Sequence, residues 1–474
     1  MGKAKHKLSF CFLYNFFCLL FLIFYSSFSF SQTIDTSYFI VKKIEVSGNK
    51  ITRSHIIFRE LEFQTGDTIF LPEEKDLFRS SRENLLNTSL FNFVTIEKKD
   101  SSGSILISVV ERWYLWPFPL LEIAERDINV WIKNPDFKKI NYGIFIDRVN
   151  FRGRKESLKF LARTGYDQEI GMAYKIPYLD KKQVFGSAFV FTLSRNHMIP
   201  YRSWGNELQY FNDEKNFSLH ELNANIQLTC RQGLYFNHII QFGFVQAKIS
   251  DSLRVSSPEY FNNQKKFKQF LSVNYRFAAD YRDSRFYPMR GHYFEFNTAK
   301  YGLGFLGNDN LDILQASAVL KKFIPLPYHF NFSASVAGKI SNHFPQPYYL
   351  QRGLGYNNQY IRGYEYYVVD GQHYTMFKTN LKYTLISNRT FHLSFIPSEK
   401  FGRGYYALYL NLFSDGGYVW DNQWNNHNPL SNLFLYSTGI GIDLVTYYDK
   451  VFRIEYSLNH MNESGLFLHF LAPI

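Results

Sequence analysis

The last two thirds of the chain alternates apolar and polar residues in many short segments, and this alternation limits the possible folds most strongly. In FRIEYSLNH, residues 452–460, every second residue from Phe452 to Leu458 is apolar, while Arg453 and Glu455 lie between them. Successive side chains of a strand point to opposite faces, so such a segment forms a strand with one apolar and one charged face. The core of a β-sandwich would not accept the charged face. A membrane barrel with a lipid-facing exterior and a wet interior accepts both faces.

Segments of this kind continue from residue 137 to the C-terminus and are separated by Gly, Asn and Asp turns. We count about 16 of them, each about 9–12 residues long, as expected for membrane strands. The sequence therefore predicts a mainly β fold, with a transmembrane antiparallel β-barrel over residues 137–474. Residues 140–151 and 465–474 would be its first and last strands. The segments begin near residues 139, 156, 168, 184, 204, 216, 234, 268, 290, 310, 328, 372, 405, 434, 451 and 464.

Composition agrees with strands rather than helices as the membrane-crossing elements. The 474 residues include 49 Phe and 35 Tyr, and aromatic residues make up 19% of the chain. The mean hydropathy is nevertheless −0.25. Helical spans of about 20 apolar residues would raise this mean, whereas alternating strands would not.

The first 31 residues have the layout of a secretory signal peptide. Three lysines precede an apolar run from Leu8 to Tyr25, and small residues follow at Ser29 and Ser31. The alternative is an uncleaved membrane anchor, because the apolar run is long. Two of the three cysteines lie inside this segment, which leaves Cys230 alone in the mature chain. A single cysteine excludes an internal disulfide and a thiolate metal site.

Residues 38–112 read as one small α/β unit with the order strand, helix, helix, strand, strand. Gly48 and Asn49 mark a turn after the first strand, and Pro72 suits the first turn of the second helix. Residues 113–136 then read as an aromatic and proline-rich linker that begins WYLWPFP. Trp113 and Trp116 would lie at a membrane–water boundary or pack as part of an ordinary linker.

Three short motifs lie within the β region. They are DYRDSRFYPMRG (280–291), YIRGYE (360–365) and FSDGGYVW (413–420). The second places Arg362 in a long loop among tyrosines. Taken alone, a loop arginine is usually solvated.

The module followed by a barrel with these motifs resembles the superfamily of outer-membrane assembly factors, of BamA and TamA type, and two-partner secretion transporters. The segment KKIEVSGN…NTSLFNFVTIE of residues 38–112 resembles a POTRA domain. The resemblance implies that the 360–365 loop folds back into the barrel and that Arg362 contacts Asp415. A desolvated guanidinium needs such a partner, and neighbouring tyrosines could stack on it. The residues that match family motifs are Asp280, Arg282, Asp283, Pro288, Gly291, Ile361, Arg362, Gly363, Tyr364, Phe413, Asp415 and Gly417.

The resemblance implies an assembly or translocation factor that inserts or translocates polypeptides, β-barrel proteins above all, at the outer membrane of a Gram-negative bacterium. Its POTRA domain would lie in the periplasm and bind client polypeptides or partner subunits, while the barrel contacts lipid; no nucleic acid is expected. A passive pore or a lipid-handling barrel is the alternative, and an outer-membrane enzyme is a third. We expect no cofactor, metal or catalytic residues. The segment HELNA, for example, has Ala224 where a zinc motif needs a second histidine.

Overall fold

The computed structural model describes residues 37–471 except 101–102, 124–130, 133–134, 136, 138–139, 214, 263, 307–310, 343–345, 357–358 and 424. The expected signal peptide, residues 1–31, lies outside the described residues. Among the helices within the described ranges, none is long and apolar enough to cross a membrane.

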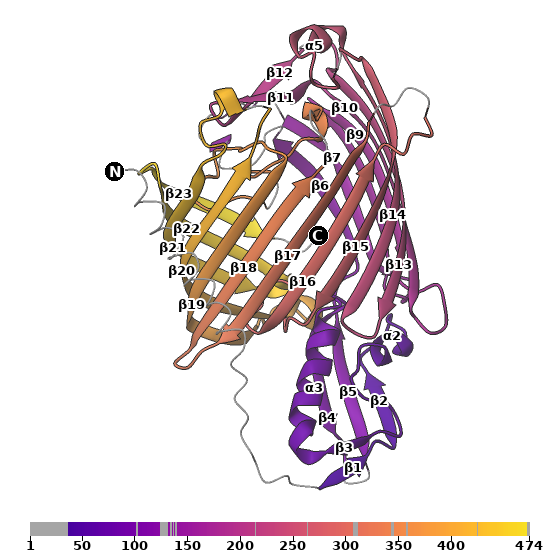
Figure 1. Cartoon of the computed structure of the whole chain (residues 1–474). Helices are drawn as coiled ribbons and strands as arrows, with labels where there is room; N and C mark the ends of the chain where they lie inside the picture. The colour runs from indigo at the N-terminus through magenta and orange to yellow at the C-terminus, as the bar shows by residue number, and fades with distance from the viewer. Residues whose placement is uncertain are drawn as a thin grey trace.

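A single 16-stranded antiparallel sheet forms the larger part of the molecule and curves into a barrel (Figure 1). The predictions of a mainly β fold and of about 16 strands are confirmed. Neighbouring strands follow chain order, except that β10 pairs with β13. The strands are β6 (Leu115–Ile123), β7 (Ile140–Phe151), β8 (Glu156–Gly165), β9 (Gln168–Ile176), β10 (Phe185–Asn196), β13 (Leu219–Gln232), β14 (Phe236–Ile249), β15 (Phe267–Asp280), β16 (Gly291–Tyr301), β17 (Ile313–Pro325), β18 (Phe330–Ser341), β19 (His373–His392), β20 (Arg403–Trp420), β21 (Phe434–Thr446), β22 (Lys450–Asn459) and β23 (Ser464–Leu471).

The strand count was right, but two strand assignments were wrong. Part of the expected 113–136 linker is the first barrel strand, β6, which pairs with β7 from Leu115↔Arg148 to Ile123↔Ile140. Two prolines argued against a strand there, but they are tolerated because β6 ends the sheet order and so has an unpaired edge. The strand expected near residue 204 instead belongs to a separate hairpin outside the barrel sheet, β11 (Met198–Trp204) with β12 (Glu207–Asn212).

The two faces of the barrel wall differ as the alternation predicts. On β21 and β22, Ile440 and Ile454 are exposed to 60% and 49%, while Asp443 and Glu455 are almost fully buried. Apolar side chains therefore cover the outside of the barrel, and charged ones pack inside it.

The N-terminal module, residues 38–112, contains a three-stranded sheet in the order β2-β5-β4, with two helices beside it. Its core includes Val41, Ile56, Leu85 and Ile105. Gly48 has φ +86°, and Asn49 donates its Nδ2 to the Thr52 carbonyl at 3.0 Å, which forms the expected turn. The elements are β1 (Tyr38–Ile40), β2 (Lys43–Ser47), α2 (Ser54–Phe58), β3 (Thr68–Phe70), α3 (Leu71–Leu86), β4 (Phe91–Lys98) and β5 (Ser104–Glu111).

The module lies against one rim of the barrel, here called the module-side rim (Figure 1). Glu60, which follows α2, is 2% exposed and accepts two hydrogen bonds from Arg231 at 2.7 and 2.6 Å. Lys155 Nζ lies 3.2 Å from the same carboxylate. Burial of Glu60 acts to raise its pKa, but Lys155 and Arg231 lower the pKa below the ordinary value of 4.5 overall.

Further contacts join the module to turns on other sides of the same rim. Asn87, just after α3, donates to the Asp283 carbonyl at 3.1 Å, and Arg290 contacts Glu83 at 2.9 Å. Arg112 forms an ion pair with Asp449 at 2.6 Å. The module therefore extends beneath the lumen and contacts turns after β7, β13, β15 and β21.

Four segments cover the opposite rim, here called the loop-side rim. They are loop 342–372, which contains η1 (Tyr348–Leu350), loop 421–433, which contains η2 (Asn425–His427), the β11–β12 hairpin, and the β14–β15 connection, which contains α5 (Asp251–Ser256) and bonds to loop 342–372 through Glu259 and Tyr260. Asn206 at the hairpin tip donates its Nδ2 to the Val368 carbonyl at 3.1 Å, and its backbone N–H donates to Asn428 Oδ1 at 2.9 Å. Trp204 stacks on His427 at 3.9 Å between ring centroids.

Candidate functional site in the barrel lumen

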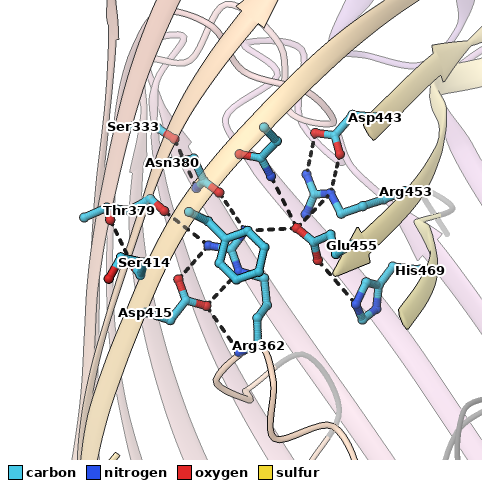
Figure 2. Close-up of polar contacts among 12 residues, drawn as sticks. Ser333, Arg362, Thr379, Asn380, Ser414, Asp415, Asp443, Arg453, Glu455 and His469 are labelled. Atoms are coloured by element: carbon cyan, nitrogen blue, oxygen red, sulfur yellow. Dashed lines mark hydrogen bonds and ion pairs between the residues drawn. The ribbon is translucent and has the colours of Figure 1, made fainter. Parts of the chain in front are cut away.

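Arg362 lies inside the barrel and is 3% exposed. Its Nε and Nη2 donate to the two oxygens of Asp415 at 2.7 and 2.6 Å. Its Nη1 donates to Asn380 Oδ1 at 2.7 Å and to Glu455 Oε1 at 3.1 Å, and Nη2 also donates to the Thr379 carbonyl at 3.2 Å. A guanidinium has five N–H donors, so every donor of Arg362 has an acceptor. Figure 2 shows how these partners surround the side chain.

The packing around Arg362 accounts for one phenylalanine and two glycines of the motifs. The guanidinium lies 3.8 Å from the ring centroid of Phe413, so a phenylalanine of β20 takes the stacking role expected of a tyrosine. Gly363 has φ +84°, and a Cβ there would lie 3.3 Å from Ser437 Cβ and Ser457 Oγ. At Gly417 a Cβ would lie 2.8 Å from Ile361 Cδ1, so this glycine lets the loop approach the wall.

The flanking residues of the loop are anchored separately. Ile361 is buried in an apolar cluster with Val419 and Leu435 of the wall. Tyr364 donates its hydroxyl to the Tyr436 carbonyl at 3.1 Å. The loop is thus fixed on both sides of the arginine.

A chain of ion pairs extends from this site toward the module-side rim. Arg453 contacts Glu455 at 3.7 Å and donates to both oxygens of Asp443 at 2.7 and 2.9 Å. The Tyr287 hydroxyl donates to Asp443 Oδ2 at 2.7 Å. Since Tyr287 belongs to the turn between β15 and β16, the loop from one rim and the turn from the other meet on one network.

The residues of the 280–291 motif build that turn. Arg282 Nε and Nη2 donate to the Asp280 carboxylate at 2.7 and 2.8 Å. Asp283 Oδ1 accepts from the backbone N–H groups of residues 284, 289 and 290 at 2.8, 3.1 and 3.2 Å, around the partly buried Pro288. Gly291 has φ +103°, and a Cβ there would lie 2.0 Å from the Tyr281 carbonyl oxygen. These residues fix a tight turn and do not contact Arg362 directly.

The structure thus brings Arg362 and Asp415 together and adds partners that motif reasoning missed, chiefly Glu455, Arg453, Asp443 and Asn380. The alternation of β22 placed Arg453 and Glu455 on the polar face, which was the one available signal. The described residues contain no group of three or more His, Cys, Asp or Glu placed to hold a metal ion. The arrangement holds charges in fixed positions and offers rigidity rather than covalent chemistry.

An antiparallel barrel with an apolar exterior, a charged interior and a loop folded into its lumen defines the class of outer-membrane β-barrels. The chain belongs to the Omp85 superfamily, since the sequence model of the Omp85 superfamily domain matches residues 150–446. It is accordingly an outer-membrane protein of the transport and assembly class and not an enzyme.

Solved structures with a similar fold include CdiB from Escherichia coli, with 10% identity, a TM-score of 0.52, and coverage of 91% of this chain and 75% of that chain. BamA from Haemophilus ducreyi lacking POTRA domains 1–3 has 14% identity, a TM-score of 0.49 and coverage of 91% and 84%. CdiB from Acinetobacter baumannii has 11% identity, a TM-score of 0.47 and coverage of 91% and 73%. No curated protein sequence matches the chain.

Proposed function

We propose that the protein inserts or translocates polypeptides at the outer membrane, with β-barrel proteins as its main clients. The observation that carries this proposal is that the two end strands of the barrel sheet are not paired with each other. β6 and β23 end the sheet order, and no ladder joins them within residues 115–123 and 464–471. Backbone groups that lack partners are costly in lipid. A seam between the first and last strands is therefore where a client strand would gain most by pairing.

The N-terminal module has the role of a POTRA domain in this proposal and lies in the periplasm. Its strands β2 and β4 are the two edges of a three-stranded sheet. An extended client chain or a partner subunit would add to such an edge through main-chain hydrogen bonds.

In this proposal Arg362 stabilises the barrel wall while a client strand pairs at the seam. Its partners lie on β19, β20 and β22, close to the end of the sheet. Fixing these strands to the inner loop keeps the wall in shape when the neighbouring seam is disturbed.

Conditional depletion of the protein, followed by quantitative proteomics and lipid analysis of the outer membrane, tests the proposal. We expect a broad fall in other barrel proteins. Loss of one secreted or surface protein alone would indicate a dedicated translocator. A change confined to lipid asymmetry would favour the lipid-handling alternative, and no change in protein or lipid would favour a passive pore.

A further inference from the structure

Three basic side chains lie next to one another on adjacent strands of the barrel wall. The ladders pair Arg195 of β10 with His220 of β13, and His220 with Lys248 of β14. Arg195 and Lys248 are also the charged groups that act on the His220 ring. Neighbouring strands lie about 4.8 Å apart, so the three residues, here called the basic row, extend over about 10 Å.

The basic row faces away from the lumen, at the loop-side end of the wall. Leu193, which shares the face of Arg195, is 39% exposed, whereas Leu219 and Ile249, which point the other way, are buried at 7% and 2%. Lys248 lies just before α5, which covers part of the loop-side rim (Figure 1). The basic row therefore belongs to the outer face of the barrel.

The height of the basic row matches the edge of a bilayer. β10 begins at Phe185 near the module-side rim, and the about ten residues from there to Arg195 extend over about 33 Å. A strand tilt of about 40° reduces this to about 25 Å along the barrel axis, which is the usual height of the apolar band of a membrane barrel. The outward residues before Arg195 are Phe189, Phe191 and Leu193. Arg195 therefore reaches the level of the lipid head groups.

A hollow of about 460 Å³ adjoins Arg195 on the same outer face. Gln168 and Arg195 line its loop-side end. One step toward the membrane centre, Ala162, Ile170 and Leu193 are paired across three strands and also line it. The volume lies within the range of about 300–1,000 Å³ that is typical of small-molecule sites. The hollow is thus polar at the head-group level and apolar below it.

The cations of the basic row have no counter-charge on their own face. Across wall strands β8 to β15 of the described chain, no carboxylate faces outward at this level, where the neighbouring positions hold Thr164, Gln168 and Phe267. Asp213 and Asp251, in the segments that adjoin these strands, are engaged elsewhere: Asp213 caps a turn, and Asp251 pairs with Lys266 at 2.5 Å. A charge at the lipid boundary calls for an anionic partner.

We propose that the basic row and the hollow bind a phosphorylated glycolipid of the outer leaflet. Its phosphate groups would contact Arg195, His220 and Lys248 through charge-assisted hydrogen bonds, and an acyl chain would occupy the hollow. An anion without an acyl chain would leave the hollow empty. A single phosphodiester would neutralise only one of the two cations, so a head group with more than one phosphate fits this surface.

The outer-leaflet position of the ligand follows from the proposed periplasmic position of the module. The site itself does not depend on whether the protein inserts polypeptides, so the proposed function and the lipid site can fail separately.

The first test titrates the full chain in detergent with diphosphoryl lipid A and measures binding by native mass spectrometry. We expect Arg195→Gln with Lys248→Gln to weaken binding at least about tenfold. The matched control, Arg148→Gln with Lys322→Gln, removes two outward cations at the module-side end of the wall and should leave binding unchanged. Equal binding by the wild type and the Arg195 and Lys248 double variant would overturn the proposal.

Two further probes distinguish the glycolipid from other phosphates. Phosphatidylglycerol should bind more weakly than lipid A and should be little affected by the double variant. Equal affinity for both lipids, lost equally in the variant, would overturn the assignment to a glycolipid. Inorganic phosphate should not displace lipid A, and displacement would reduce the basic row to an anion site without a role for the hollow.

The second test fills the hollow and leaves the charges in place. Ala162→Trp should weaken lipid A binding about fivefold or more, because the indole would occupy the space for the acyl chain. The control is Ala224→Trp, which faces outward on β13 but does not line the hollow. Heat-modifiable gel migration verifies that both variants fold. Unchanged binding in Ala162→Trp would overturn the role of the hollow and with it the proposed acyl-chain contact.

Discussion

Arg362 is the residue on which most of the luminal contacts converge. Because its partners are buried carboxylates, removing the cation takes the bidentate partner from Asp415 and leaves Glu455 with its longer contact to Arg453 at 3.7 Å. Breaking a buried pair from one side costs about 3–5 kcal/mol. Lysine would keep the charge but has only three donors and no planar fork.

We predict that Arg362→Glu lowers barrel stability by at least about 3–5 kcal/mol and that Asp415→Arg, added to it, restores part of the loss. Restoration stays partial because the carboxylate introduced at position 362 would still lie beside Glu455. Heat-modifiable gel migration and urea unfolding measure the effect. Arg202→Glu, the same charge change at an exposed hairpin residue, serves as control and should migrate as the wild type does. A normally folded Arg362→Glu protein would refute the buried-pair role.

How far the sequence could predict this site depends on the kind of contact. The pairing of Arg362 with Asp415 came from a motif resemblance, and the alternation of β22 placed Glu455 on the correct face. The contact between Arg362 and Glu455 depends on how loop 342–372 lies across several strands. Phe413 was assigned to a strand motif and not to the cation, because stacking depends on how deeply the loop enters the lumen.

Among the elements, the β11–β12 hairpin was predicted least well from the residue pattern, which assigned it to the barrel wall. Over Glu207–Tyr210 the hairpin alternates polar and apolar residues as barrel strands do, so the pattern there does not separate the two. What differs is the pairing partner, since β10 continues the barrel with β13 and leaves the hairpin outside. In β6 the opposite error arose, because prolines that exclude a central strand are acceptable on an edge.

The hairpin tip should control the order of the outer loops. Asn206 is fully buried, and its side chain bonds to Val368 and also accepts from the Leu430 N–H at 2.8 Å. We predict that Asn206→Ala leaves the barrel strands intact but exposes loop 342–372 to added protease. The buried Val368 carbonyl and the Leu430 N–H lose their partner, at a cost of about 1–3 kcal/mol for each group. Protease digestion of intact cells with mass mapping measures this. Cleavage indistinguishable from Asn212→Ala, at the other end of β12, would contradict the prediction.

On the scale of the whole molecule, the module is held against the rim by a charge cluster with a defined pH response. Glu60 has a lowered pKa when docked, so the docked state favours its ionised form. The sign follows from linkage: the stabilisation is complete above the ordinary pKa of 4.5 and is lost as pH falls below it. Docking should therefore be constant between about pH 7 and pH 5 and weaken toward about pH 3.

We predict that Glu60→Gln weakens docking at neutral pH and removes most of this acid response. The neutral side chain leaves Arg231 and Lys155 close together without a counter-charge. Hydrogen exchange of residues 54–63 measures docking. The control is Glu45→Gln, because Glu45 pairs with Lys43 and Lys99 inside the module and not with the barrel. This variant should leave docking and its acid response unchanged. An unaltered acid response in Glu60→Gln would show that other groups control docking.

Both rims of the barrel are covered, and the two covers act in series. We predict that the wild-type protein conducts far less in planar bilayers than an open barrel of about 16 strands would. Asn206→Ala or Glu60→Gln alone should raise conductance little, because the other cover remains, whereas the double variant should raise it strongly. Stable, porin-sized conductance of the wild type would support the passive-pore alternative.

The contacts of Arg362 also tie the luminal site to the far end of the chain. The loop that carries it joins β18 to β19, yet the guanidinium is held by groups of β19, β20 and β22. The full set of acceptors therefore exists only once β22, the next-to-last strand of the sheet, has taken its place in the wall. A barrel that lacked its last two strands would leave the buried guanidinium without Glu455, so this loop packs fully only in a nearly complete barrel.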